Sequence, residues 1–545
     1  MRGAKSAKWV ASAIVVALAA TACGGNDSSN DGGKGEVDPN GVFRLTNSEP
    51  QGNLQPANSR DTASGQVIKG LFSQLVDYKK DGSAELVYVN AESVETEDNR
   101  TWTVKLKKGW KFHDGEEVTS KSFVDAWNWA ANIDNNQQNS YWFADIKGYE
   151  DVHPSKGKPK AKEMSGLKVV DDHTFTIELT EPVTYFNYKL AYSAWSPLPS
   201  KFYDDPKAYG DKPVGNGPYK FVSWERKKKI TLERYDEYQG PDKAENGGVE
   251  LVVYNTLEAQ YQAVASEKAD VITQIPPRDL PKYRQDFGDR AIDAPMAGVQ
   301  SIVPVFYGDQ WKLGDEKNAK LRQGLSMAID RKTITDKVLN GSRVPATGFV
   351  GPNVLGFQEG VLGEVAEYNP EKAKKTIEDA GGVPGNKVHI QYNADGGHKE
   401  WVEAVCNNIR QNTGVECIPD AKVDFQTDLN TRDAKKVKSM YRGGWVLDYP
   451  VNVNFMRELY ETGADSNTGF FSSKKVDELF KKGDSAADLD GTVKAYQEAE
   501  KELVKEMPAI PLWYYSTQAA HSKKVNNVEF DLANFLLMHK VKVVK

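Results

Sequence analysis

The amino-acid sequence predicts a mixed α/β fold. Three stretches alternate apolar and polar residues with a period of two, as half-buried β-strands do: Trp102 to Leu106, Phe175 to Leu179 and Val249 to Val253. Other segments repeat apolar residues every three or four positions, as on one face of an α-helix. The chain has 545 residues, of which 39% are hydrophobic. It is therefore long enough for a large core in roughly two to four structural units.

Several helices are expected from their ends and faces. Thr119-Ser120 can cap one helix, and Asn369-Pro370 can start another that stops at Gly381-Gly382. The apolar faces comprise Phe123, Trp127 and Ala130; Ala373, Ile377 and Ala380; Trp401, Val405 and Ile409; and Val493, Tyr496, Ala499 and Leu503. We expect these faces to pack in the core rather than to bind a ligand.

The N-terminus has the pattern of an export signal. Basic residues precede an apolar stretch, Trp9 to Ala22, of about 14 residues, which is shorter than the roughly 20 of a transmembrane helix. Small residues before Cys23 and Gly-Gly after it resemble a bacterial lipobox, with Ala20 in place of the usual Leu. We expect a lipoprotein signal peptide at 1–22, lipidation of Cys23, and a flexible tether at 23–41. The alternative is a secreted protein without a lipid.

Two further cysteines, Cys406 and Cys417, favour a disulfide, because an even number of thiols in an exported chain is usually paired. Cys406 lies in a predicted helix and Cys417 in the strand after a turn at Thr413-Gly414. The alternatives are free buried thiols or a metal pair. No CxxC spacing and no nearby histidine cluster supports the metal pair.

Composition and motifs argue against two classes of protein. The net charge is -7 and no long basic run stands out, the nearest candidate being Lys227 to Lys229. These features give no basis for nucleic-acid binding. The sequence has no G-x-S-x-G, H-E-x-x-H or Walker A motif. Gly215-Asn216-Gly217 lacks the third glycine of a dinucleotide loop. We expect no enzymatic activity, cofactor or metal, with a lipoprotein hydrolase as the alternative.

Four motifs carry a resemblance to a known family. They are AESVETEDNRTWTVKLKKGWKFHDGEEVTSKSFVDAW (91–127), VDDHTF (170–175), GNGPY (215–219) with Trp224 and Leu232-Glu233-Arg234, and LRQGLSMAIDR (321–331). In this order they resemble the peptide-binding (family 5) solute-binding proteins of ABC importers, above all the periplasmic oligopeptide-binding type. The resemblance covers the chain from Val42 to its C-terminus.

The resemblance implies a three-lobed, periplasmic-binding-protein-like (type II) Venus-flytrap fold. The lobes would be 42–72 with 197–298 and 517–545 (lobe I), 73–196 (lobe II) and 299–516 (lobe III). Lobes I and III would close around the ligand by a hinge motion.

The run from Tyr441 to Pro450, YRGGWVLDYP, resembles the family's R-x-G-W-x-x-D-Y. The resemblance implies that Asp448 binds the N-terminal ammonium of a peptide, since an ammonium in a closed cleft needs a charged partner. The backbone of Gly444 and Val446 would pair with the ligand as an added β-strand, and Trp445 would wall a side-chain pocket. Without the resemblance, Asp448 has an alternative role in a turn or cap before Pro450.

Three basic residues match family positions that reach the ligand's carboxylate: His398, Arg432 and Arg442. Arginine suits this task because its fork can bond both carboxylate oxygens. Where the family has a lysine, this chain has Leu339, which leaves the set of carboxylate partners open. Surface or inter-lobe ion pairs are the alternative for the arginines, and a surface position at a helix start is the alternative for His398.

Three residues from the first part of the chain match further ligand contacts. Tyr141 matches a family tyrosine, with core packing as its alternative. Arg60 and Thr62 match positions that face the ligand strand, and Arg60 stands where one well-known relative has an acidic residue.

The function that the resemblance implies is capture of oligopeptides outside the cytoplasm and delivery to a two-subunit ABC permease. ATP hydrolysis would occur on other chains. The protein would be a monomer, anchored by its lipid at the outer face of the cytoplasmic membrane. The same fold binding nickel, haem, a sugar or an antibiotic is one alternative, and a surface antigen is another.

Overall fold

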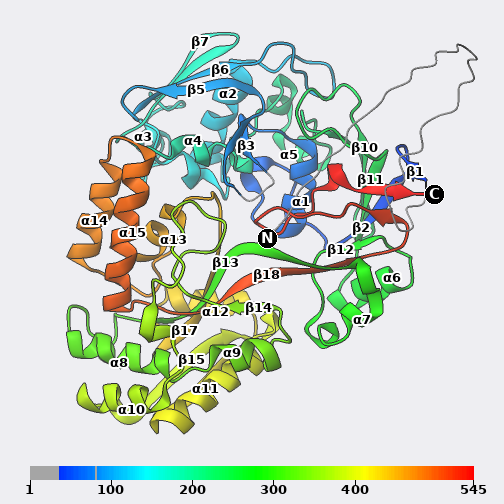
Figure 1. The fold of residues 1–545 in the computed structure, drawn as a ribbon. Helices are drawn as coiled ribbons and strands as arrows, with labels where there is room; N and C mark the ends of the chain where they lie inside the picture. Colours follow the sequence, from blue (N-terminus) through cyan, green and yellow to red (C-terminus); the bar gives the residue numbers. More distant parts are fainter. Residues whose placement is uncertain (1–35, 80–82) are drawn as a thin grey trace, which may run out of the picture. The chain divides into compact units, whose positions relative to one another are not determined.

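The structure is a computed structural model that describes residues 36–79 and 83–545, and in this part of the chain the largest element is an 11-stranded mixed sheet (Figure 1). Its path runs β16-β15-β17-β13-β18-β12-β2-β11-β10-β9, and β14 pairs with β18 off this path. The strands are β2 (Val42–Asn47), β9 (Tyr219–Glu225), β10 (Lys229–Arg234), β11 (Gly248–Val253), β12 (Val271–Ile272), β13 (Ala291–Pro304), β14 (Arg343–Pro345), β15 (Lys387–Asn393), β16 (Glu416–Lys422), β17 (Met440–Val446) and β18 (Ile510–His521).

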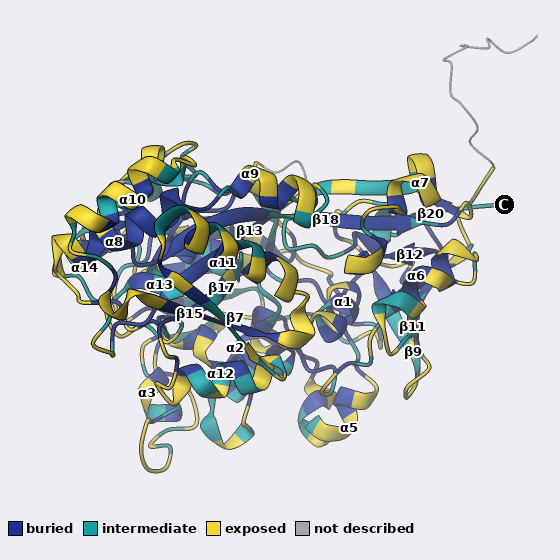
Figure 2. Ribbon diagram, turned by 90° about the horizontal axis from the view of Figure 1, so that it is seen from below, coloured by how far each residue is buried: buried dark blue, intermediate teal, exposed yellow. Residues whose placement is uncertain are grey.

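Two long antiparallel strands, β13 and β18, join the two ends of this sheet. They have 14 and 12 residues, and their register shifts between Pro295 and Val299. Both expected boundaries of lobe III, 298/299 and 516/517, fall inside these strands. In Figure 2, β18 and the second half of β13 are largely buried, so this part of the pair lies in the interior.

A second, four-stranded sheet has the order β5-β6-β8-β7. Its strands are β5 (Ala91–Thr96), β6 (Thr101–Leu106), β8 (Thr174–Glu178) and β7 (Leu167–Asp171). The helix α2 (Ser120–Ala131) packs on it, with the rings of Phe123 and Phe175 stacked at 6.0 Å between centroids. A capping box between Thr119 and Ser122 starts this helix. The predicted strands and the predicted start of the helix are confirmed.

Helices cover the remaining faces. They are α1 (Thr62–Leu71), α3 (Tyr149–Val152), α4 (Phe186–Lys189), α5 (Pro206–Asp211), α6 (Leu257–Ala265), α7 (Tyr283–Phe287), α8 (Glu316–Met327), α9 (Arg331–Thr333), α10 (Pro370–Asp379), α11 (Lys399–Thr413), α12 (Phe425–Asp433), α13 (Val453–Tyr460), α14 (Lys474–Asp484) and α15 (Leu489–Glu506). The side chain of Asn369 caps α10, and Gly381 and Gly382 follow it with φ of +95° and +79°. Both are conformations that glycine adopts without strain, as the predicted stop requires.

A disulfide joins Cys406 in α11 to Cys417 in β16. Both cysteines are buried. The predicted pairing is therefore confirmed, and it ties a helix to the strand that follows it.

The folded region begins earlier than expected. The strand β1 (Val37–Asp38) pairs antiparallel with β20 (Lys542–Val544) near the C-terminus. Residues 37–41, which were expected to belong to the tether, are instead part of the folded region, because the pairing of Val37 and Asp38 with β20 holds them. The predicted signal peptide and Cys23 lie outside the described residues. Within the described ranges, no helix is long and apolar enough to cross a membrane.

Candidate functional site

A cavity of about 800 Å³ lies among segments that are far apart in the sequence. Its volume is within the usual range for ligand sites. It is lined by residues from 46–51, 59–65, 69–79, 191–193, 446–450 and 530–539, among others. Four of the predicted site residues are part of this lining: Arg60, Thr62, Val446 and Asp448.

Asp448 is held in place by one amide side chain. Its backbone N–H donates to Oδ1 of Asn454 at 2.9 Å, and Nδ2 of Asn454 donates back to the Asp448 carboxylate at 3.2 Å. The indole Nε1 of Trp445 donates to the same Oδ1 at 3.1 Å. Asn454 therefore orients both predicted residues. Nothing in the sequence alone marked Asn454 for this role.

The surroundings of Asp448 disfavour its charged form. Burial is the main cause, and together with the negative charge of Glu458 it raises the pKa of the Asp448 carboxyl to about 6, while the hydrogen bond from Asn454 and the charges of Lys189 and Arg60 lower it. Among residues 36–79 and 83–545, no basic side chain forms an ion pair with Asp448. The carboxylate thus lines the cavity without an ion-pair partner among the residues that the structure describes.

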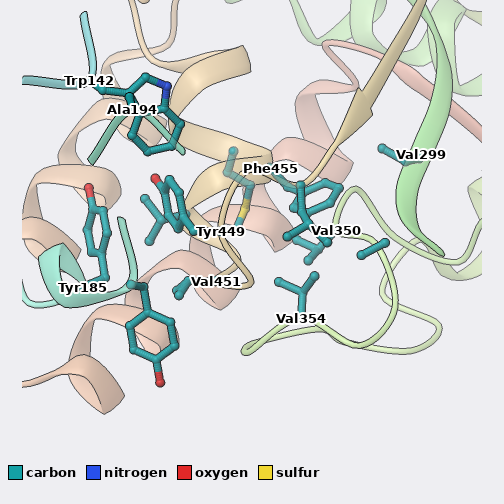
Figure 3. Close-up of a cluster of buried hydrophobic side chains, with 14 of the residues drawn as sticks. Trp142, Tyr185, Ala194, Val299, Val350, Val354, Tyr449, Val451 and Phe455 are labelled. Carbon is teal, nitrogen blue, oxygen red and sulfur yellow. The ribbon is translucent and has the colours of Figure 1, made fainter. Parts of the chain in front are cut away.

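Aromatic packing supports the segment that carries Asp448 (Figure 3). The ring of Tyr449 stacks on the ring of Tyr185, with 5.7 Å between the ring centroids. The ring of Trp142 contacts the Tyr449 ring edge-on, with 6.3 Å between the centroids. The hydroxyl of Tyr185 in turn accepts a hydrogen bond of 3.0 Å from Arg457 in α13. Residues far apart in the chain thereby hold the ring of Tyr449, the residue directly after Asp448.

The strand before Asp448 has an open edge. β17 pairs along its length with β13, but β15 pairs only with Met440 and Tyr441. On the side away from β13, residues 442–446 therefore have no strand partner in the part of the chain that the structure describes. Such an edge offers backbone groups to an extended peptide.

Arg60 and Tyr141 lie together. The Arg60 guanidinium sits 5.6 Å from the centre of the Tyr141 ring. Tyr141 is 45% exposed, so its alternative role in core packing does not hold. Thr62 is the first residue of α1, which Asp61 caps by accepting from the backbone N–H of Ser64.

The other predicted residues form a separate basic cluster. Arg432 is buried and paired with Asp428, and it donates to the backbone carbonyl of Arg442 at 2.9 Å. The Arg442 side chain donates to Asn393 at 2.9 Å. Burial, followed by the charge of Arg442, lowers the pKa of His398 to about 3, so this imidazole is neutral. His398, Arg432 and Arg442 are not in the lining of the cavity.

Further cavity residues were missed from the sequence. Tyr192 comes from the region of the second sheet, and Leu532 to Leu537 return from the C-terminal segment. The carbonyl of Leu532 accepts from the N–H of Ala297 at 2.9 Å, which seats that segment beside β13. Because this contact joins residues far apart in the sequence, no local sequence pattern could have predicted it. Lys189, whose charge acts on Asp448, was also missed.

Comparisons with known proteins show which family and fold this chain resembles. The family model of the bacterial extracellular solute-binding proteins, family 5 (middle), matches residues 85–467. Oligopeptide-binding protein OppA of Bacillus subtilis is 27% identical over 541 residues, covering 94% of this chain and 95% of the relative. Periplasmic oligopeptide-binding protein OppA of Salmonella typhimurium is 26% identical, covering 93% and 92%.

Two solved structures are also similar. One is Haemophilus influenzae OppA in complex with the peptide RPPGFSPFR, with a TM-score of 0.74, 23% identity and coverage of 94% and 100%. The other is the Escherichia coli murein tripeptide-binding protein MppA, with a TM-score of 0.75, 22% identity and coverage of 93% and 99%. These likenesses confirm the predicted fold class, an α/β type II Venus-flytrap.

Proposed function

Because this chain belongs to family 5 of the bacterial extracellular solute-binding proteins, we propose that it captures oligopeptides outside the cytoplasm and delivers them to the permease of an ABC importer. The names of its relatives support a peptide as ligand. The proposal includes the lipid anchor at Cys23 and the three lobes with the boundaries given above, and it assigns ATP hydrolysis to other chains.

The observation that carries the proposal is the carboxylate of Asp448. It is half-buried, lines the cavity and has no basic partner among the described residues. A charge desolvated in this way is unfavourable until a cation arrives. The N-terminal ammonium is a cation that every unmodified peptide carries, so this one contact suits ligands of varied sequence.

The open edge of β17 supplies the second contact. The backbone of Gly444 and Val446 would pair with the ligand as an added strand. Trp445 stands between them in sequence and is half-buried, so it would wall a side-chain pocket. Main-chain pairing is again independent of the ligand's side chains, and waters can fill the space around them.

For the ligand's carboxylate we propose Arg442. Its guanidinium is bonded to the neutral amide of Asn393, whereas Arg432 is already paired with Asp428. Arg432 would then support Arg442 through the bond to its carbonyl, and the neutral His398 would contribute hydrogen bonding rather than charge.

Native mass spectrometry of the purified protein, before and after exposure to a mixed peptide library, tests the proposal. We expect intact peptides to be retained and N-acetylated copies to be retained far less, because acetylation removes the ammonium charge. Retention of both alike would contradict the role of Asp448. Cleaved peptides would instead identify a hydrolase, and a library that leaves the protein unliganded would favour a non-peptide solute such as nickel, haem or a sugar.

A further inference from the structure

The cavity that Asp448 lines also holds a positive charge, on Arg60. The Arg60 side chain is exposed and lines the cavity. Within the described part of the chain, no carboxylate forms an ion pair with it. Its charge lowers the pKa of the Asp448 carboxyl, so the two groups interact across the same space.

Arg60 is also held in a defined orientation. Its guanidinium lies over the face of the Tyr141 ring, 5.6 Å from the centre. A stacked guanidinium is less free than a solvated one, and its planar fork can bond both oxygens of a carboxylate. A surface arginine with only a solubilising role needs neither this stacking nor a place in the cavity lining.

We infer that Arg60 selects peptides with an acidic side chain at the first or second residue. The inference depends on the proposed function, because the ammonium on Asp448 fixes which end of the ligand lies near Arg60. An extended chain advances only about 3.4 Å per residue, so the first two side chains lie nearest the ammonium. Successive side chains point to opposite sides, so one of these two positions faces Arg60.

The expected discrimination is moderate. Arg60 is in contact with solvent, which weakens an ion pair, but the bidentate geometry strengthens it. We expect a peptide with glutamate at the selected position to bind about threefold to tenfold tighter than its glutamine counterpart, and the lysine counterpart to bind more weakly than glutamine. The preference should shrink as salt concentration rises.

Isothermal titration calorimetry of the purified protein tests the inference. The ligands are alanine pentapeptides with Glu, Gln or Lys at position 1, 2 or 4. In the unaltered protein, the Glu preference should appear at position 1 or 2 and be absent at position 4. Arg60→Gln should abolish it, and Arg60→Glu should reverse it in favour of Lys. Lys207→Gln is the matched control, since Lys207 is exposed on α5, away from the cavity lining, and its loss changes the charge equally.

The outcomes separate the two proposals. If the glutamine peptides bind and the glutamate peptides bind no better at position 1 or 2, the inference about Arg60 is overturned while peptide capture stands. If none of the pentapeptides binds, the proposed function fails and the inference fails with it. The comparison within the unaltered protein decides the matter even where a variant does not fold.

Discussion

Replacing Asp448 by asparagine should make the unliganded protein more stable and a poorer receptor. Asparagine has nearly the same shape and can still accept from Asn454, but it carries no charge. If Asp448 served only as a turn or cap residue, the same replacement would leave stability unchanged or lower it. The two roles therefore predict opposite signs.

The magnitude follows from the pKa. A carboxyl whose pKa is raised from 3.8 to about 6 costs the folded state about 3 kcal/mol at pH 7 when each pH unit is worth 1.36 kcal/mol. Asp448 is only half-buried, so solvent screening reduces this figure, and we expect a gain of about 1–3 kcal/mol for Asp448→Asn.

The sign of the pH dependence follows as well. Because the folded state holds the proton more tightly than the unfolded state, the penalty is present above pH 6 and disappears as the pH falls from about 6 to about 4. The charged groups that act on the Asp448 carboxyl, Glu458, Lys189 and Arg60, are present in both proteins, so contributions that do not depend on Asp448 cancel in the difference.

Urea denaturation of the unliganded protein and of Asp448→Asn at pH 7.5 and pH 4 measures this difference in unfolding free energy. A difference that is equal at the two pH values would refute the reasoning. Calorimetry should show peptide affinity reduced at least tenfold in the variant, or about 1.4 kcal/mol. In the unaltered protein, affinity should fall below pH 6, with proton release on binding that the variant lacks.

Three further predictions concern stability, each measured by urea denaturation. Replacing Cys406 and Cys417 by alanine should cost about 2–3 kcal/mol, because the bridge closes a short loop of the unfolded chain, and reductant should then have no effect; a reductant effect that persists would contradict this. Arg331→Met should cost about 3 kcal/mol or more, because buried carbonyls lose their donor; a loss below 1 kcal/mol would argue against it. Gly444→Ala should cost about 1–3 kcal/mol, because the new methyl would overlap the hydroxyl of Tyr515; adding Tyr515→Phe should recover part of that loss, and no recovery would exclude the overlap.

The parts of the fold that were predictable are those set by neighbours in sequence. The capping box at Thr119 and the Asn369-Pro370 start depend on residues within one helical turn. The disulfide was equally accessible, because a helix and the strand after it are joined by a tight turn at Gly414 that brings Cys406 and Cys417 together.

The site was less predictable because its walls come from distant segments. The likeness of the run around Asp448 to a family motif marked that carboxylate, but not the amide of Asn454 that orients it. The wall formed by Leu532 and its neighbours depends on where the C-terminal segment returns. One feature of the site could have been predicted, namely the ion pair that Arg432 forms. Asp428 precedes Arg432 by four residues in a helix, which is the spacing of an ion pair within one helix.

An unpaired strand edge is also a hazard, because it can join the edge of another copy and begin aggregation. The open stretch of β17 carries features that limit this risk. The open stretch comprises only residues 442–446 and begins with the charged Arg442. Pro450 follows a few residues after its end. A neighbouring molecule would find too few free backbone groups, next to a charge, to build a stable intermolecular sheet. The same brevity sets an upper limit on how much of any guest chain can be held by main-chain bonds, so longer guests would have free ends.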